Sequence, residues 1–422
     1  MINKQKSEFS KNVLTLMTGT TIAQAIPISV SPILTRIYTP EDFGILALFV
    51  AITSIFGSIA NGRYELAIML PKKDEDAINI FALGFIIVSC LSMFLLFIVT
   101  VFHDIILDLL HNKEMSFWLY FIPIAVFFIG LFNILTYFNN RKKQYKDLAN
   151  ATIVKAIVTA VVQLSIGFLK SGVTGLISGQ LASQFFANMK LLTNIIKNKN
   201  LISKISKVKI IALAKKYKDF PKFTLWAGLA STLSVQLTNI FISSLFSVMT
   251  LGFYSLVQRV LGVPMALIGS SIGKVFFQIA IEEKQKYGTS IKSFKLTLKK
   301  LIFLSLIFFP VLYFFIEDIF VLVFGNDWKI AGEYAKTLIP LIAIQFVVSP
   351  LTVINQVYRK NKNVMYWQFG LLLNYMLILY LTSINNIEFL VVLRYISFFI
   401  SIYYIFHLFL LFTYIRKENK NG

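Results

Sequence analysis

Three cationic side chains lie inside long apolar stretches of the chain: Lys155, Arg259 and Arg394. A charge at the centre of a membrane-spanning helix costs roughly 2.5–3.5 kcal/mol on insertion scales, so a cation persists there when it faces water or an anion. Asp and Glu are absent from the middle of every apolar stretch. A cationic interior without acids predicts an anionic solute, because a carrier of cations would need a carboxylate at membrane depth.

Arg259 is the sharpest of these candidates because it lies deep in its stretch. It belongs to a stripe of small and polar residues that recur at spacings of three and four, which places them on one face of a helix. Such a stripe alone is typical of a tight helix–helix contact, but a central arginine favours a water-filled cavity. The stripe consists of Ser255, Arg259, Gly262, Ala266, Ser270 and Gly273.

The other candidate cations have two interpretations each. Lys155 either faces the cavity or extends to the nearer, cytoplasmic interface, and Arg394 either faces the cavity or extends to the outer interface. Arg63 and Lys274 occupy corresponding inner ends of the second and eighth stretches. We expect both to bind the solute, and the alternative is that they are ordinary cationic anchors of cytoplasmic loops.

Polar residues on the first and seventh stretches would complete such a cavity. Gln24 lies on the polar face of the first stretch and Asn239 on that of the seventh, so both are expected to contact the solute. A proline removes a backbone hydrogen bond and breaks or kinks a helix. Pro27, Pro32 and Pro264 are therefore predicted to be the flexible points of a conformational change.

Twelve apolar stretches must position these residues, since a helix needs about 20 mostly apolar residues to cross the hydrocarbon of a membrane. Of the 41 Lys and Arg, 33 lie at the chain termini or in every second gap between the stretches, five lie in the other gaps and three lie deep inside the stretches, when residues at the very ends of a stretch are counted with the adjoining gap. Cytoplasmic loops carry the Lys/Arg excess, so the alternation predicts the direction of each crossing and places both chain termini in the cytoplasm. The expected spans are 12–35, 43–62, 77–101, 116–138, 149–169, 173–192, 222–246, 249–273, 299–321, 334–357, 363–382 and 387–414.

Composition agrees with an integral membrane protein, with 57% hydrophobic and 14% charged residues. The net charge of +21 follows from bases retained in cytoplasmic loops, where they favour anionic lipid, so we expect membrane lipid and no nucleic acid as a partner. The single cysteine excludes an intramolecular disulfide. The alternative for the first stretch is a signal peptide cleaved near Ala23-Gln24-Ala25, which would remove that span.

The second half of the chain repeats the first in weak but collinear matches. Phe121-Ile-Pro123 aligns with Leu338-Ile-Pro340, for example. An even number of spans per half gives both halves one orientation, so we expect an all-α membrane fold of two six-helix lobes related by a pseudo-two-fold axis along the membrane normal. The expected domains are an N-terminal lobe at 1–192, a basic cytoplasmic linker at 193–221 and a C-terminal lobe at 222–422. The linker either carries an interfacial amphipathic helix at 202–213 or is a solvated loop.

Two stretches of sequence resemble bacterial polysaccharide flippases of the Wzx type, which belong to the multidrug/oligosaccharidyl-lipid/polysaccharide exporter superfamily. They are Pro32-Ile-Leu-Thr-Arg-Ile-Tyr-Thr-Pro-Glu-Asp-Phe-Gly44 and Arg63-Tyr-Glu-Leu-Ala-Ile-Met-Leu-Pro-Lys-Lys-Asp-Glu-Asp-Ala77. The segments 140–149 and 324–335 look similar to that family as well. The first of these motifs is fairly specific, and elsewhere the resemblance is mostly one of hydropathy.

The resemblance implies a central cationic cavity and alternating access in the bacterial cytoplasmic (inner) membrane. The implied cargo is an oligosaccharide on undecaprenyl pyrophosphate, such as an O-antigen repeat unit. Arginine forks bind phosphate oxygens bidentately, and related peptidoglycan-precursor flippases have an arginine in the eighth helix, which supports Arg259 alone. We expect a monomer without a cofactor, with other polysaccharide-assembly membrane proteins as candidate partners. The coupling ion, proton or sodium, is unknown from the sequence.

Two other classes of protein remain as alternatives. A drug/cation antiporter of the same superfamily would require the buried acid that the apolar stretches lack. A membrane polysaccharide polymerase or glycosyltransferase could use Asp74-Glu75-Asp76 as a metal-binding pattern. Acids at this position also suit the positive N-terminal end of the third helix, and the gaps are too short for a catalytic domain. The interpretation as a transporter, not an enzyme, is therefore preferred.

Overall fold

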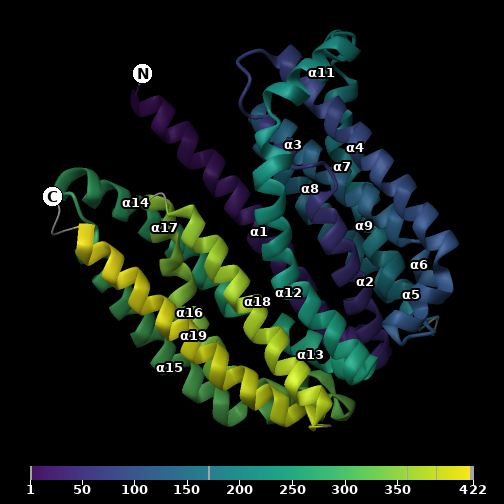
Figure 1. The fold of residues 1–422 in the computed structure, drawn as a ribbon, viewed down its shortest axis with the longest axis vertical. Coiled ribbons are helices and arrows are strands. Elements are labelled where there is room, and N and C mark those ends of the chain that lie inside the picture. Colours follow the sequence, from purple (N-terminus) through teal and green to yellow (C-terminus); the bar gives the residue numbers. More distant parts are fainter. Residues whose placement is uncertain (1, 170–171, 359, 386, 419–422) are drawn as a thin grey trace. The chain divides into compact units, whose positions relative to one another are not determined.

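The computed structural model of the protein describes residues 2–169, 172–358, 360–385 and 387–418, and every regular element in these ranges is helical (Figure 1). The chain divides into two compact units, Met1–Ser244 and Leu245–Gly422. The sequence-based division differs in detail, because it starts the second lobe at residue 222. In the structure α12 (Leu225–Leu245) and the basic segment before it group with the first unit.

The first unit is built from long helices joined by short ones. Its long helices are α1 (Ile2–Ile37), α2 (Pro40–Ile59), α4 (Asp74–Val101), α7 (Ile122–Arg141), α8 (Tyr145–Gly167), α9 (Val173–Ile196) and α12. Its short elements are α3 (Tyr64–Ala67), α5 (His103–Leu110), α6 (Met115–Leu119), α10 (Lys199–Ile202), α11 (Lys207–Lys216) and the π-helix η1 (Phe220–Thr224).

The second unit contains longer helices, several of which are interrupted. Its elements are α13 (Val248–Leu261), the π-helix η2 (Met265–Gly269), α14 (Ser270–Tyr287), α15 (Ile291–Phe324), the 3-10 helices η3 (Asn326–Trp328) and η4 (Ser349–Val353), α16 (Lys329–Val348), α17 (Ile354–Val357), α18 (Asn361–Ile384) and α19 (Phe389–Glu418). Near the η3 end, the rings of Phe253, Trp328 and Tyr334 pack edge to face, with centroids 5.8 and 6.1 Å from that of Phe253. Such contacts stabilise buried aromatic rings.

In the described chain, ten helical stretches are long and apolar enough to cross a membrane. They coincide with ten of the expected spans. The other two expected spans coincide with α1 and α9, which are helices of 36 and 24 residues. The helices exceed the expected ends most clearly between α14 and α15, because α14 continues to Tyr287 and α15 begins at Ile291.

The junction of α1 and α2 carries the motif that is most specific in the sequence. Thr39 caps α2 and forms a capping box with Asp42, which satisfies backbone N–H groups at both positions. The ring of Tyr38 is buried, and its hydroxyl donates to the carbonyl oxygen of Gln163 at 2.6 Å. Burial, with the nearby Asp42 carboxylate, raises the pKa of Tyr38 to about 12. The motif therefore attaches the start of α2 to α8.

The basic segment after α9 is folded onto the first unit rather than forming a solvated loop. Asn79 on α4 donates to the carbonyl oxygen of Lys204 at 3.0 Å and accepts from the N–H of Ser206 at 2.8 Å. The Tyr64 hydroxyl donates to the carbonyl oxygen of Ala214 at 3.0 Å. The amphipathic helix expected at 202–213 is thus present as α11, shifted toward the C-terminus, and it contacts protein.

The acids at the start of α4 are neutralised by basic side chains. Asp74 binds Arg141, with Nε and Oδ1 2.9 Å apart, and also binds Lys142. Glu75 binds Lys209 at 3.0 Å and Lys204 at 3.6 Å. These ion pairs fix α7 and the basic segment to α4. They occupy the carboxylates that a metal-dependent enzyme would need, and the described residues contain no group of three potential metal ligands.

Candidate functional site

Arg63 lies in the turn between α2 and α4, in a left-handed backbone conformation with φ of 64°. Its Nη1 is 3.6 Å from Oε1 of Glu65, and the two side chains are 23% and 5% exposed. Nε of Arg63 and Oε2 of Glu65 are buried without a hydrogen-bond partner in the described part of the chain. Burial raises the pKa of Glu65, and the hydrogen bond from its backbone and the charge of Arg63 oppose that rise. The pair therefore retains binding capacity for a further polar group.

The guanidinium of Arg63 also contacts α12. A Cβ added to Gly228 would overlap Nη2 of Arg63 and would lie 2.7 Å from its Nε. Gly228 lies on α12, and its close approach to Arg63 gives a physical reason for glycine at this position. Arg63 is more than a loop anchor at the surface, because it is held between α3 and α12.

Lys155 lies half-buried on α8. Its Nζ is 5.4 Å from the centre of the Phe132 ring on α7, a cation–π distance. Among the described residues it forms no ion pair. A half-buried ammonium without a carboxylate partner is a candidate site for an anion.

Gln24 is half-buried on α1, and this helix passes through Pro27 and Pro32 without interruption. Ser31 donates its hydroxyl to the carbonyl oxygen of Pro27 at 2.6 Å, and Thr35 donates to that of Pro32 at 3.1 Å. Hydroxyls bound to carbonyls one turn earlier tend to bend a helix. Helix α1 continues past both prolines. Their role as hinges stays a prediction.

Asn239 is half-buried on α12 and donates to Oε1 of Gln236 at 3.1 Å. The two residues share the polar face that the sequence indicated. The binding roles of Asn239 and Gln24 remain predictions.

Arg259 lies half-buried in the last turn of α13, where a cation suits the negative end of the helix dipole. Helix α13 ends at Leu261, Gly262 is a turn residue, and Pro264 directly precedes the π-helix η2, so the regular α-helix is interrupted on both sides of Pro264. The interruption is at the position where the sequence predicted a kink. Single-turn π-helices are frequent at functional sites.

Lys274 is exposed on α14 and lines a cavity of about 350 Å³ with Gly269, Gly273 and Pro350. Gly273 faces Pro350, and a Cβ added to it would lie 3.5 Å from Cα of that proline. The C-terminal end of the predicted small-residue stripe thus packs closely against η4, as the alternative interpretation of the stripe proposed.

Arg394 is exposed on α19 and lines a separate cavity of about 740 Å³ formed with α15 and α16. Lys336, Glu317 and Glu333 also line this cavity. The structure therefore does not bring Arg394 and Lys274 into one pocket of the second unit. The sequence indicated that acids are absent from the middle of every span, and it did not predict that helix packing gathers these acids into one cavity with Arg394.

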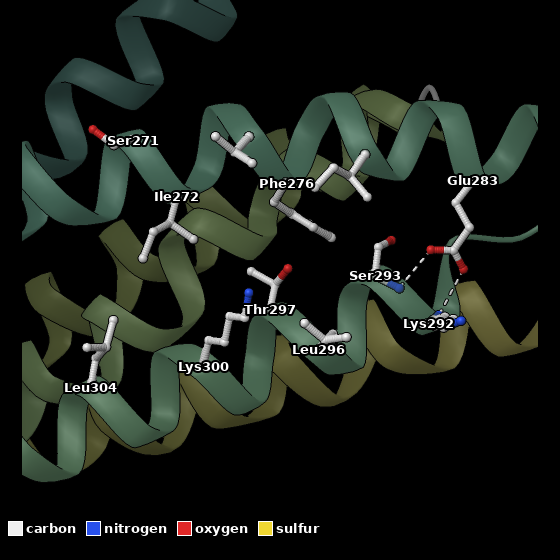
Figure 2. Close-up of a pocket in the computed structure, with 12 residues that line it drawn as sticks. Ser271, Ile272, Phe276, Glu283, Lys292, Ser293, Leu296, Thr297, Lys300 and Leu304 are labelled. Atoms are coloured by element: carbon white, nitrogen blue, oxygen red, sulfur yellow. Dashed lines mark hydrogen bonds between the residues drawn. The ribbon is translucent and has the colours of Figure 1, made fainter.

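A further pocket lies between α14 and α15 and has a volume of about 520 Å³ (Figure 2). Glu283 accepts from the N–H groups of Lys292 and Ser293 at 2.9 and 2.7 Å and so caps the start of α15. Figure 2 shows Lys300 extending from α15 toward the space between the two helices. The sequence analysis counted these lysines as loop charges and did not predict the pocket.

Residues 33–333 match the model of a family described as polysaccharide biosynthesis protein. The chain belongs to this family. A comparison with curated protein sequences finds no match.

Several solved transporter structures have folds similar to that of this chain. An inward-facing multidrug resistance MATE transporter of the MOP superfamily has a TM-score of 0.72 at 13% identity, covering 96% of this chain and 95% of the other. The lipid II flippase MurJ, in an inward closed conformation, has a TM-score of 0.70 at 13% identity, covering 94% and 87%. A MATE transporter from Vibrio cholerae, VcmN, has a TM-score of 0.59 at 11% identity, covering 96% of both chains.

These likenesses establish the architecture of the polysaccharide biosynthesis protein. It is an all-helical, multi-pass membrane protein with the two-lobed fold of MATE transporters and MurJ. This is the fold of solved transporter structures, and it is the fold class that the sequence predicted. The fold is the one expected for the multidrug/oligosaccharidyl-lipid/polysaccharide exporter superfamily.

Proposed function

We propose that this protein is a lipid-linked oligosaccharide flippase that moves an undecaprenyl-pyrophosphate-linked repeat unit from the cytoplasmic to the outer leaflet by alternating access. The observation that carries the proposal is the presence of Lys155 and Arg259 on membrane-spanning helices of a polysaccharide biosynthesis protein. A phosphate group needs cationic partners in hydrocarbon, and a sugar head group does not explain such cations. The fold shared with a lipid II flippase supports a lipid-linked cargo.

Arg259 binds the pyrophosphate in this mechanism, with its planar fork matched to two phosphate oxygens. Lys155 and Arg63 contribute further positive charge. Arg63 is suited to this role because its Nε is buried without a hydrogen-bond partner in the described residues. Gln24 and Asn239 provide amide groups that can bind sugar hydroxyls, and Lys274 adds a charge near the inner end of its helix.

The polyprenyl tail remains in lipid while the head group crosses, because only the head group carries a large penalty in hydrocarbon. The two lobes alternate between access from the cytoplasm and from the opposite side. The interruption around Pro264 and the segment of α1 that contains Pro27 and Pro32 take up the required change in helix direction. Both chain termini lie on the cytoplasmic side of the inner membrane in this proposal, as the Lys/Arg distribution indicates.

The first test of this function is a deletion strain, which should accumulate lipid-linked repeat units accessible only from the inner leaflet. Replacing Arg259 by Glu should abolish complementation, because a carboxylate repels phosphate. Arg259→Lys should retain part of the complementation, because lysine keeps the positive charge but loses the bidentate fork. Membrane abundance of each variant serves as the control. Full transport by Arg259→Glu at equal abundance would exclude this role.

A drug/cation antiporter would share the fold, so the same strains should be tested for efflux of a cationic dye. We expect the deletion to leave efflux unchanged. A loss of dye efflux together with normal repeat-unit transport would replace the flippase proposal by the antiporter.

A further inference from the structure

The cavity that contains Arg394 has features of a binding site of its own. It lies over α16, between α15 and α19, and all of its lining residues belong to the second unit. Its volume of about 740 Å³ is in the range of sites for small ligands. It is distinct from the cavity beside Lys274, and the transport mechanism above does not use it.

Two of the four charged side chains in this cavity form an ion pair with each other, and the other two do not. Lys336 and Glu317 form an ion pair, with Nζ and Oε1 3.2 Å apart, and the lysine also lies over the Tyr313 ring. Arg394 and Glu333 form no ion pair with any residue that the structure describes. The site therefore offers one guanidinium and one carboxylate to a ligand.

Serine hydroxyls extend the cationic side of the cavity. Ser397 and Ser401 follow Arg394 on α19 at spacings of three and four, so the three side chains share one face of the helix. Ser401 is 8% exposed, and its hydroxyl is buried without a hydrogen-bond partner in the described chain. A buried, unbonded hydroxyl that lines the same cavity as a guanidinium, about two helical turns away, is suited to an anionic oxygen of a ligand large enough to reach both groups.

The rim of the cavity is apolar and exposed. Phe398 is 62% exposed and Tyr313 39% exposed, on helices that are apolar enough to cross a membrane. Side chains of this kind on a membrane-spanning helix contact acyl chains. A ligand that enters between them is therefore an amphiphile from the bilayer.

We propose that this cavity binds the head group of a zwitterionic phospholipid, with its phosphate on Arg394 and Ser401 and its ammonium on Glu333. The formal charges of the four ionisable lining residues cancel. A net-neutral site with separated charges matches a zwitterion, whereas the pyrophosphate of the transported lipid would meet two carboxylates. The exposed Phe398 and Tyr313 contact the acyl chains of the bound lipid.

The test is native mass spectrometry of the full-length protein, purified and incubated with equal amounts of phosphatidylethanolamine, phosphatidylglycerol and undecaprenyl phosphate. The wild-type protein should retain phosphatidylethanolamine preferentially. Arg394→Gln should weaken this retention about tenfold, the effect of one lost charge-assisted hydrogen bond. Glu333→Gln should shift the preference to phosphatidylglycerol, because the site then carries a net positive charge.

Glu388→Gln is the matched control, since Glu388 is exposed at the same end of α19 but does not line the cavity. It should retain phosphatidylethanolamine as the wild type does. Equal retention by Arg394→Gln and Glu388→Gln, with both proteins monodisperse, would overturn the proposal. Preferential retention of undecaprenyl phosphate by the wild type would also overturn it and would instead assign the cavity to the cargo.

Discussion

The packing of Tyr38 against two glycines allows a quantitative test of the contact between α2, α8 and α9. A Cβ added to Gly175 would overlap the Tyr38 hydroxyl oxygen, and the next ring atom, Cζ, would be 3.1 Å away. The ring cannot move aside easily, because it is buried and its hydroxyl donates to Gln163. Overpacking destabilises the folded state by up to about 3 kcal/mol. The higher helix propensity of Ala than of Gly stabilises it by about 1 kcal/mol. We therefore expect Gly175→Ala to lower the free energy of unfolding by about 2 kcal/mol.

The overlap depends on one oxygen atom, so removing that atom should relieve it. Tyr38→Phe alone should cost about 1 kcal/mol through the lost hydrogen bond. Combined with Gly175→Ala, it should leave the methyl group 3.1 Å from the ring, a tight contact that the ring, no longer held by the hydroxyl hydrogen bond, relieves by shifting a few tenths of an ångström. The double variant should then be more stable than the sum of the single changes, with a coupling energy of about 2 kcal/mol.

Gly167→Ala provides the matched control. A Cβ there would lie 2.7 Å from the Tyr38 oxygen, but also 2.8 Å from Cζ and from Cγ2 of Ile37. Tyr38→Phe should therefore not rescue it. Thermal unfolding of the detergent-solubilised protein measures all five variants. Equal rescue of both alanine variants, or a wild-type melting temperature for Gly175→Ala, would refute this account of the packing.

Three further predictions concern other parts of the first unit. Gly228→Ala should displace the flexible guanidinium of Arg63 and reduce transport in complementation assays while membrane abundance stays constant; unchanged transport would argue against a role for Arg63. The hydrogen bond to Asp104 raises the pKa of His103, so this contact stabilises the fold below the unfolded pKa of about 6.5 and its effect is lost as pH rises through the raised value. The difference in melting temperature between wild type and Asp104→Asn should accordingly be largest in acid and shrink toward pH 8, and a difference that grows with pH would contradict it. Thr39→Ala removes the cap of α2 and should cost about 1 kcal/mol of unfolding free energy, measured by thermal melts; a stability equal to the wild type would show that the cap is replaced.

The sequence predicted the helices well because spanning a membrane requires long apolar stretches, which hydropathy reports directly. The packing between segments that are distant in the chain could not be predicted from the sequence. Tyr38 was recognised as part of a motif, but its contacts with α8 and α9 depend on how three helices meet. Pro27 and Pro32 were expected to break α1, and the helix continues because proline in a membrane helix can be accommodated by neighbouring polar groups.

The candidate site was predicted only in part, because the sequence shows a charge in an apolar stretch but does not show which helices pack together. Lys155 and Arg259 could be selected because their charge is costly in an apolar stretch. The contact of Arg63 with Gly228 and its left-handed backbone depend on the tertiary fold. Glu317 and Glu333 could not be identified from the sequence, since they line one cavity with Arg394 only when α15, α16 and α19 pack together.

The basic segment is attached to α4 and therefore belongs to the first unit. The connection to the second unit comes later in the chain, after Ser244. Asn79 and Glu75 on α4 bind this segment at Lys204, Ser206 and Lys209. The segment is therefore not a flexible linker. The crossing point is the short turn between α12 and α13, where Ser247 already caps the next helix by accepting from the N–H of Thr250 at 2.9 Å. Residues inserted into the basic segment would therefore add length within the first unit and leave the short turn between α12 and α13 unchanged.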